Sequence, residues 1–215
     1  MLIEEQRAKL ILDLRQWGFN DDKVMRVMES VPRDFFLADD YLNDAYENIA
    51  LPIGSGQTIS QPFVVAIMTA YLMPDKNVKV LEIGTGCGYQ TAILSHLFRR
   101  VYTIERIKEL LQSAKDRFKT LRLHNITSRC ADGSQGWLEQ KPFPRIIVTA
   151  VAEKIPTMLA DQLAIGGKMV IPVGLEWGEQ ELLLVERNET GYSEKKIMPV
   201  KFVPLVTGKN GNGRS

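Results

Sequence analysis

Short apolar runs alternate with amphipathic stretches from Val78 to Gly174. The apolar runs, such as V-K-V-L-E-I and R-I-I-V-T-A-V-A, have the length and composition of buried strands. The stretches between them place apolar residues at helical spacing. The predicted order is strand–helix–strand–helix–strand–strand–helix–strand. This order implies an α/β fold with a doubly wound, mainly parallel sheet that is covered by helices on both faces.

The flanking segments have other patterns. Residues 1–30 predict two helices, with Asn20 or Asp21 capping the second, and Phe35, Phe36, Tyr41 and Tyr46 then predict an aromatic cluster. Near the other end, V-K-F-V-P-L predicts an edge strand. We expect an N-terminal helical extension over residues 1–50 packing on the core, the main domain over 51–208 and a disordered tail over 209–215, as one structural domain overall.

The segment L-P-I-G-S-G-Q-T-I-S-Q-P at 51–62 carries no charge, although solvated loops usually do. Its hydroxyl and amide side chains suit a loop that lies beside a ligand and donates hydrogen bonds. It can also be a capped loop before the next helix, with Ser60 as N-cap and Pro62 in the first turn. The two interpretations are compatible. A later stretch, I-P-T-M-L-A-D-Q-L, predicts a helix that ends at the Gly166-Gly167 pair.

Composition narrows the class of protein. The net charge of +1 gives no electrostatic reason to expect nucleic acid or an anionic membrane as partner. No run approaches the roughly 20 apolar residues of a membrane span, and the acidic N-terminus is unlike a signal peptide. Cys87 and Cys130 have neither disulfide-framework nor metal-site spacing. We therefore expect a cytoplasmic monomer without a metal.

Three glycines at alternate positions, Gly84, Gly86 and Gly88, follow the first buried strand and precede a helix. Glycine adopts positive φ easily and lets a ligand approach the backbone, while the helix N-terminus offers free N–H groups. An ordinary strand-to-helix turn is one interpretation. Glu105 closes the next strand, 17 residues after Gly88, which is near the interval expected for an acid that binds ribose hydroxyls. Both NAD and S-adenosylmethionine fit these features.

Three details favour S-adenosylmethionine. The spacing is G-x-G-x-G, whereas pyrophosphate binders have G-x-G-x-x-G. Glu82 precedes the glycines, where a carboxylate would repel pyrophosphate but favour a cationic ligand, directly or through water. Asp132-Gly133 follows the third strand, where the carboxylate can accept from an adenine amino group. The predicted cofactor residues are Glu82, Gly84, Thr85, Gly86, Gly88, Glu105, Asp132, Gly133 and Thr149.

The chain resembles the bacterial protein-L-isoaspartate O-methyltransferases from Val31 to Gly208. The most specific matches are G-S-G-Q-T-I-S-Q-P, L-E-I-G-T-G-C-G-Y-Q-T-A-I-L, Y-T-I-E-R-I, D-G-S-Q-G-W, I-I-V-T-A-V-A-E-K-I-P, G-G-K-M-V-I-P-V-G and K-F-V-P-L. The resemblance implies a seven-stranded methyltransferase sheet whose last two strands are ordered differently from most relatives. It implies methyl transfer from S-adenosylmethionine to the α-carboxylate of L-isoaspartyl residues in damaged proteins, which starts repair through a succinimide. It also assigns Ser60 to the active site.

Two positions depart from the family pattern. Cys87 stands where serine or glycine is more usual, and a thiol is small enough for the turn. Val65 stands where some members have histidine, so no histidine role is assigned.

The implied reaction needs no general base, because a carboxylate with a pKa of about 4 is ionised at neutral pH. Ser60 and backbone N–H groups could hold one carboxylate oxygen, and the V-K-F-V-P-L segment could pair with an extended peptide. The predicted substrate-binding residues are Gln57, Thr58, Ile59, Val203 and Leu205. Three alternatives remain: a methyltransferase of another substrate, a cofactor-binding protein without catalysis, and a nicotinamide oxidoreductase.

Overall fold

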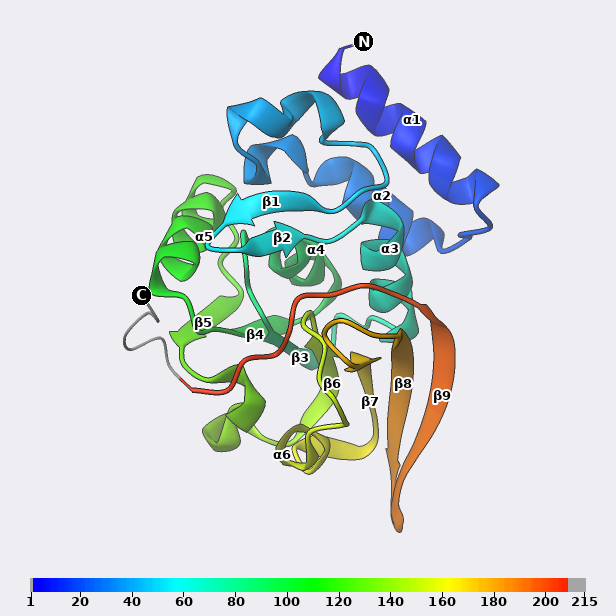
Figure 1. Ribbon diagram of the computed structural model, residues 1–215, viewed down its shortest axis with the longest axis vertical. Helices are drawn as coiled ribbons and strands as arrows, with labels where there is room; N and C mark the ends of the chain where they lie inside the picture. Colours follow the sequence, from blue (N-terminus) through cyan, green and yellow to red (C-terminus); the bar gives the residue numbers. More distant parts are fainter. Residues whose placement is uncertain (1, 209–215) are drawn as a thin grey trace.

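Seven strands form one sheet in the order β5-β4-β3-β6-β7-β8-β9 (Figure 1). In this computed structural model, residues 2–208 are described. The first five strands of that order pair in parallel, β8 pairs antiparallel with β7, and β9 pairs antiparallel with β8, which confirms the predicted α/β fold. The strands are β3 (Lys79–Ile83), β4 (Arg100–Glu105), β5 (Ile126–Cys130), β6 (Phe143–Val148), β7 (Leu163–Gly174), β8 (Gln180–Asn188) and β9 (Gly191–Pro199). The tail expected over 209–215 lies outside the described residues.

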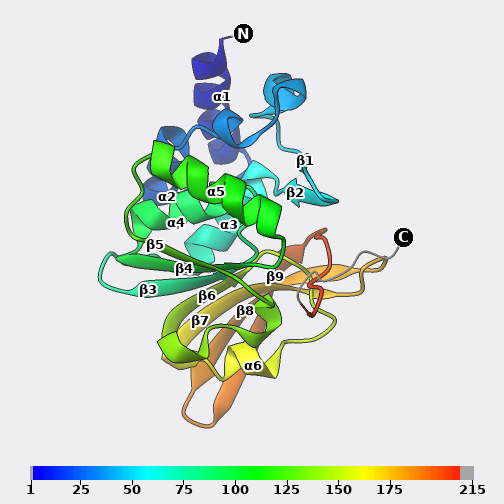
Figure 2. The same ribbon diagram turned by 90° about the vertical axis from the view of Figure 1, so that its left-hand side faces the viewer.

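The helices cover the two faces of the sheet unequally, with α1 to α5 on one side and α6 on the other (Figure 2). They are α1 (Ile3–Gln16), α2 (Asp22–Ser30), α3 (Pro62–Tyr71), α4 (Tyr89–Leu97), α5 (Lys108–Thr120) and the single turn α6 (Thr157–Ala160). Successive strand residues divide between the two faces, as the pleat requires. Val80 and Ile147 join the core beneath α2 to α4, while Leu81 and Ile146 join the core on the α6 side.

The N-terminal helices share the larger core with α3 and α4. Leu10 and Leu14 of α1 and Met25 and Met28 of α2 are buried in this cluster. Asp21 caps α2 by accepting hydrogen bonds from the main-chain N–H groups of Lys23 and Val24. The extension is therefore continuous with the core of the sheet domain.

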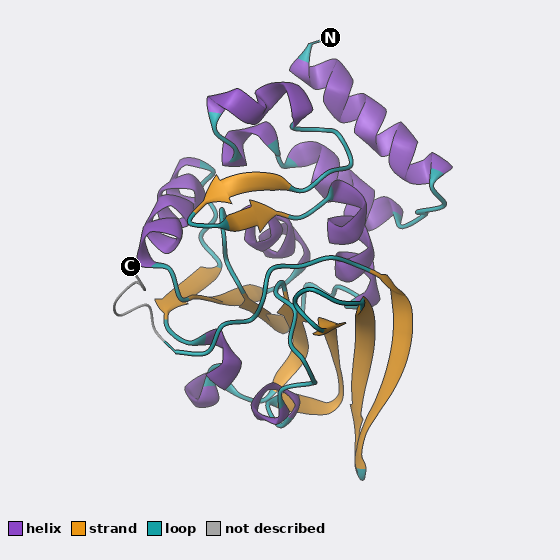
Figure 3. Cartoon of the chain, in the orientation of Figure 1, coloured by secondary structure: helices purple, strands orange, loops and turns teal. Residues whose placement is uncertain are grey.

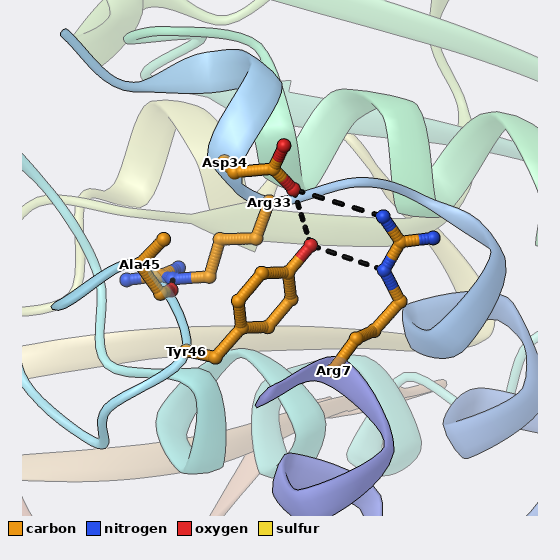
Figure 4. A network of polar contacts seen from close by, with 5 residues as sticks. All are labelled: Arg7, Arg33, Asp34, Ala45 and Tyr46. Carbon is orange, nitrogen blue, oxygen red and sulfur yellow. Dashed lines mark hydrogen bonds and ion pairs between the residues drawn. The ribbon is translucent and has the colours of Figure 1, made fainter. Parts of the chain in front are cut away.

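A polar network fixes the segment that follows α2 (Figure 4). The Tyr46 hydroxyl donates to Asp34 and accepts from Nε of Arg7 at 3.1 Å. The fully buried Arg33 donates from Nε to the Ala45 carbonyl oxygen at 2.8 Å. These bonds hold residues 33–46 between α1 and the strand pair that begins at residue 51.

The uncharged segment 51–62 is a hairpin of β1 (Leu51–Gly54) and β2 (Gln57–Ile59), where we expected a loop (Figure 3). Its two-residue turn places Ser55 and Gly56 at φ +53° and +68°, and such positive angles match the twist of a hairpin. Ser60 does not cap the next helix. The N-cap is Gln61, and Pro62 occupies the first turn as predicted.

Two other expectations about secondary structure were wrong. The stretch around residue 160 forms only one helical turn, and β7 begins at Leu163, before Gly166-Gly167. The glycine pair lies at an irregularity of this strand, because the pairing moves from Phe143↔Leu163 to Arg145↔Lys168.

The segment after β9 is not an edge strand. It crosses the carboxyl ends of the sheet and forms only an isolated bridge, Val151↔Pro204. Val203 accepts from the Val151 N–H at 2.9 Å, and the Leu205 N–H donates to the Val151 carbonyl at 2.8 Å. The edge strand of the sheet is β9.

Candidate active site

A cavity lies at the carboxyl ends of β3, β4 and β6, where ligands of parallel sheets bind. The hairpin β1–β2 and residues 203–206 complete its walls, and the space amounts to about 860 Å³ including its open mouth. Most of the predicted site residues meet there: Gln57, Thr58, Ile59, Ser60, Gly84, Thr85, Gly86, Glu105, Gly133, Thr149, Val203 and Leu205. The predicted residues Glu82, Gly88 and Asp132 do not line it.

The glycine turn has three left-handed residues with different surroundings. Gly84 has φ +95°, and a Cβ there would lie 2.3 Å from Oγ1 of Thr149. Gly88 has φ +94°, and its Cβ would lie 2.6 Å from the Phe118 ring. Gly88 therefore allows α5 to pack against the turn and is not part of the cavity wall. Gly86, at φ +53°, is part of that wall.

Thr149 attaches the end of β6 to the glycine turn. Its Oγ1 donates toward the carbonyl oxygens of Ile83 at 3.0 Å and Gly84 at 2.8 Å, and its N–H donates to the Ile83 carbonyl at 2.9 Å. These bonds explain why Gly84 has no room for a side chain.

We expect Gly84→Ala to lower the free energy of unfolding by about 3 kcal/mol or more, because it adds backbone strain and an overlap with Thr149. Gly18→Ala is the matched control, since Gly18 has φ +87° but no atom within 4 Å of its Cβ position. The control should lose only about 1–2 kcal/mol. Urea unfolding measures both variants, and equal losses would show that the overlap with Thr149 does not matter.

Glu105 braces the turn from the end of β4. Its Oε2 accepts from the Gly86 N–H at 2.9 Å, and its Oε1 accepts from the Ile107 N–H at 2.9 Å. The side chain is nearly buried but lines the cavity. Each carboxylate oxygen keeps a second lone pair, so it can also accept from a ligand hydroxyl. The acid and the glycine turn therefore fit a nucleoside with free ribose hydroxyls.

Glu82 lies beneath the turn and does not line the cavity, which corrects the expectation of a direct contact with the ligand. Its side chain is 0% exposed and faces α4, because it alternates with Leu81 along β3. Oε2 accepts from the hydroxyls of Thr91 and, at 2.6 Å, Thr103. The Thr103 hydroxyl is also 2.6 Å from that of Thr85, which lines the cavity. Glu82 is thus linked to the cavity only indirectly, through the hydroxyls of Thr103 and Thr85.

Burial raises the pKa of Glu82 to about 8, even though the hydrogen bonds from Thr103 and Thr91 act in the opposite direction. Within the described part of the chain, its Oε1 has no hydrogen-bond partner. A carboxyl with this environment is protonated over much of the neutral pH range.

Asp132 also lies outside the cavity wall. Its Oδ1 accepts from the N–H of Ser134 at 2.9 Å and from its hydroxyl at 2.7 Å, and its Oδ2 accepts from the Gly208 N–H at 2.7 Å. Burial acts to raise the pKa of Asp132, but the hydrogen bonds from Gly208 and Ser134 outweigh it and lower the pKa. The neighbouring Gly133 does line the cavity, so an adenine contact by Asp132 stays a prediction.

Ser60 lies between β2 and α3, where the cavity meets a second hollow. Among the described residues, none forms a hydrogen bond with its hydroxyl. The second hollow lies beside the cavity and shares a wall with it. That wall consists of Thr58, Ser60, Thr149, Val203 and Pro204, all of them uncharged. An anionic group held at Ser60 would thus face both hollows.

Sequence reasoning missed several residues of the cavity. Val65 and Met68 of α3 follow a helical apolar pattern that predicts only core, and the polar Gln90 begins α4 just after the turn. The other members outside the predicted set are Ile53, Ile83, Cys87, Tyr89, Ile104, Arg106, Ala150, Pro204 and Val206. Only Gln90 carried a usable signal, as a polar residue next to the glycines.

The family model for protein-L-isoaspartate(D-aspartate) O-methyltransferase (PCMT) matches residues 5–210 of the sequence. The chain belongs to this family. A protein-L-isoaspartate O-methyltransferase of Parvibaculum lavamentivorans is 50% identical over 207 residues, covering 95% of this chain and 93% of its own. One of Rhodospirillum rubrum is 52% identical over 210 residues, covering 97% and 96%.

Solved structures of the family have the same fold. A protein-L-isoaspartate O-methyltransferase superimposes with a TM-score of 0.85 at 28% identity, covering 96% of this chain and 67% of that chain. A putative family member from Plasmodium falciparum, in complex with S-adenosyl-L-homocysteine, has a TM-score of 0.82 at 24% identity, covering 93% and 98%. The family membership confirms the resemblance seen in the sequence. Over residues 2–208, none of the helices has the length and apolar character that crossing a membrane requires.

Proposed function

We propose that this protein transfers the methyl group of S-adenosyl-L-methionine to the α-carboxylate of L-isoaspartyl residues in damaged proteins and peptides. The backbone nitrogen of the next residue then attacks the ester carbonyl and methanol leaves, which gives a succinimide and starts repair. One observation carries the proposal. The glycine turn and Glu105 share a cavity with the uncharged wall around Ser60, so a methyl donor and a carboxylate can meet there.

S-adenosylmethionine supplies an electrophilic methyl group on a positively charged sulfur. We propose that Gly84, Thr85 and Gly86 hold this cofactor through their backbone, and that Glu105 accepts from its ribose hydroxyls. Gly133 and Thr149 line the same cavity. Ile83, Ile104 and Met68 provide apolar surface, which keeps water away from the reacting groups.

The acceptor carboxylate is already ionised, so the residues around it orient it and remove water. We propose that the Ser60 hydroxyl donates to one carboxylate oxygen and leaves the other free to attack. Thr58 on the same wall is a further donor, and Gln57 is another donor that lines the cavity. A lysine or arginine at this position would reduce the nucleophilicity of the carboxylate and repel the sulfonium.

The main chain at residues 203–206 offers one edge to a peptide. Val203 and Leu205 turn their main-chain groups toward Val151. In an extended segment the alternate residues face the opposite way, so the free edge consists of the Pro204 carbonyl, since proline has no N–H, and the main-chain groups of Val206. A substrate peptide that pairs there would form hydrogen bonds through its main chain, so different side chains would be tolerated.

Two matched peptides test the function, one with L-isoaspartate and one with L-aspartate at the same position. We expect methyl transfer from labelled cofactor only to the isoaspartyl peptide. Equal incorporation would indicate a methyltransferase of another substrate. Tight cofactor binding without turnover would indicate a binding protein.

We expect Glu105→Ala to weaken S-adenosylhomocysteine binding about 5- to 150-fold, which corresponds to the loss of about 1–3 kcal/mol for a hydrogen bond to a charged group. Titration calorimetry measures the affinity. Glu109→Ala is the control, because Glu109 is exposed in the first turn of α5 and does not line the cavity. Unchanged affinity in Glu105→Ala would exclude the residue from cofactor binding.

The cytoplasmic location, the monomeric state and the absence of nucleic-acid and membrane partners remain proposals from composition. Light scattering of the purified protein tests the monomer.

A further inference from the structure

The loop between β7 and β8 exposes two large apolar side chains beside the active site. Trp177 is 88% exposed and Leu175 is 62% exposed. Single exposed apolar residues are common on protein surfaces, but tryptophan is costly to leave in water and is enriched where proteins bind partners. The high exposure of Trp177 therefore suggests that it contacts a binding partner.

The main chain of this loop is held in place by one buried glutamine. Gln180 is 3% exposed, and its Nε2 donates toward the carbonyl oxygens of Leu175 at 3.2 Å and Glu176 at 3.3 Å. Its Oε1 accepts from the Phe202 N–H at 2.7 Å. One side chain thus attaches the loop to the segment that continues into the cavity wall at Val203. These bonds hold the main chain next to Trp177, and Trp177 and Ser60 line the same hollow.

Trp177 lines the second hollow, the one that meets the cavity at Ser60. Glu176 and Lys201 lie on the same side of this hollow, and Lys201 Nζ donates to the Glu176 carbonyl oxygen at 3.1 Å. The remaining lining includes Val64 and Phe202, which are apolar. The hollow therefore offers a mainly apolar surface with one charge of each sign.

The proposed substrate continues beyond its reactive carboxylate, because an isoaspartyl residue is part of a polypeptide. A chain held at Ser60 has flanking residues on both sides, and the second hollow is the adjoining space that can receive one of them. We propose that Trp177 is a specificity-determining residue that contacts an apolar side chain flanking the isoaspartyl residue. This inference rests on the proposed function. Apolar neighbours are exposed mainly in unfolded chains, so this contact favours damaged proteins that have lost their fold.

The test uses two isoaspartyl peptides that differ only in the residues two positions before and after the isoaspartate, which are leucine in one and serine in the other. We expect Trp177→Ala to raise KM for the leucine peptide about tenfold, because an apolar contact is lost, with kcat nearly unchanged. KM for the serine peptide should change less than twofold. Trp177→Phe should restore most of the preference, and the affinity for S-adenosylhomocysteine should not change.

Ile165→Ala is the matched control, since Ile165 is 70% exposed near the beginning of β7, at the opposite end of the strand. It should leave both KM values as in the wild type. If Trp177→Ala affects neither peptide while the wild type methylates both, the inference is wrong and the function stands. If the wild type methylates neither peptide, the proposed function itself fails. A wild-type dimer that Trp177→Ala converts to monomer with unchanged KM would identify the surface as a self-interface and also overturn the inference.

Discussion

Ser60→Ala is expected to lower the turnover of an isoaspartyl peptide about 100-fold, a loss typical of a misplaced reacting group. The hydroxyl lies on the uncharged wall and has no hydrogen-bond partner among the described residues, so it is free to hold a carboxylate oxygen. Without it, the carboxylate still enters the cavity but is not fixed in line with the methyl group. Cofactor affinity should stay within about twofold, because the glycine turn and Glu105 are unchanged.

Single-turnover methylation and calorimetry with S-adenosylhomocysteine separate these effects. Ser193→Ala, in the exposed edge strand β9, is the control and should behave as the wild type. Wild-type turnover in Ser60→Ala would remove the residue from the active site. A parallel loss of cofactor affinity would instead indicate that the cavity had changed shape.

Glu82→Gln is expected to change how stability depends on pH. The pKa of Glu82 is about 8 in the folded protein and about 4.5 when the group is unperturbed, so between these values the folded state binds a proton that the unfolded state has released. The contribution of Glu82 to stability is therefore fully present below about pH 4.5. It decreases as pH rises toward 8, by up to ~1.4 kcal/mol per pH unit. Glutamine does not titrate, so the Glu82→Gln variant does not lose stability in this way as pH rises.

Urea unfolding of the cofactor-free protein at pH 5, 6.5 and 8 measures the difference between the two proteins. The stability of Glu82→Gln relative to the wild type should rise steadily over this series. Glu82→Ala should be destabilised by about 3 kcal/mol or more, since it leaves a cavity and removes the acceptor of two buried hydroxyls. A wild type and a Glu82→Gln variant with parallel pH profiles would show that the carboxyl is ionised in the folded state.

The parallel sheet and the glycine turn could be predicted because their signals are local. Buried strands, amphipathic helices and positive-φ glycines each appear within a few residues of sequence. Glu105 could be placed for the same reason, since it ends a strand adjacent to the turn.

Features that depend on which face or edge a residue occupies were harder to predict. Glu82 was assigned to the ligand because it precedes the glycines, but it alternates with Leu81 and so faces α4. The strand period shows that Glu82 and Leu81 face opposite sides of the sheet, but it does not show which side α4 covers. The hairpin at 51–59 depends on positive φ at Ser55, which few sequence signals reveal. The course of residues 201–205 depends on Gln180 and Val151, which are distant in sequence.

The wall around Ser60 combines an early hairpin with the segment Val203–Leu205, which follows every strand of the sheet. During synthesis, a chain that has been extended only through β9 contains the glycine turn and Glu105 but lacks one side of the acceptor site. The proposed acceptor site is thus completed only by residues 203–205, whereas the proposed cofactor-binding residues all precede them in the sequence.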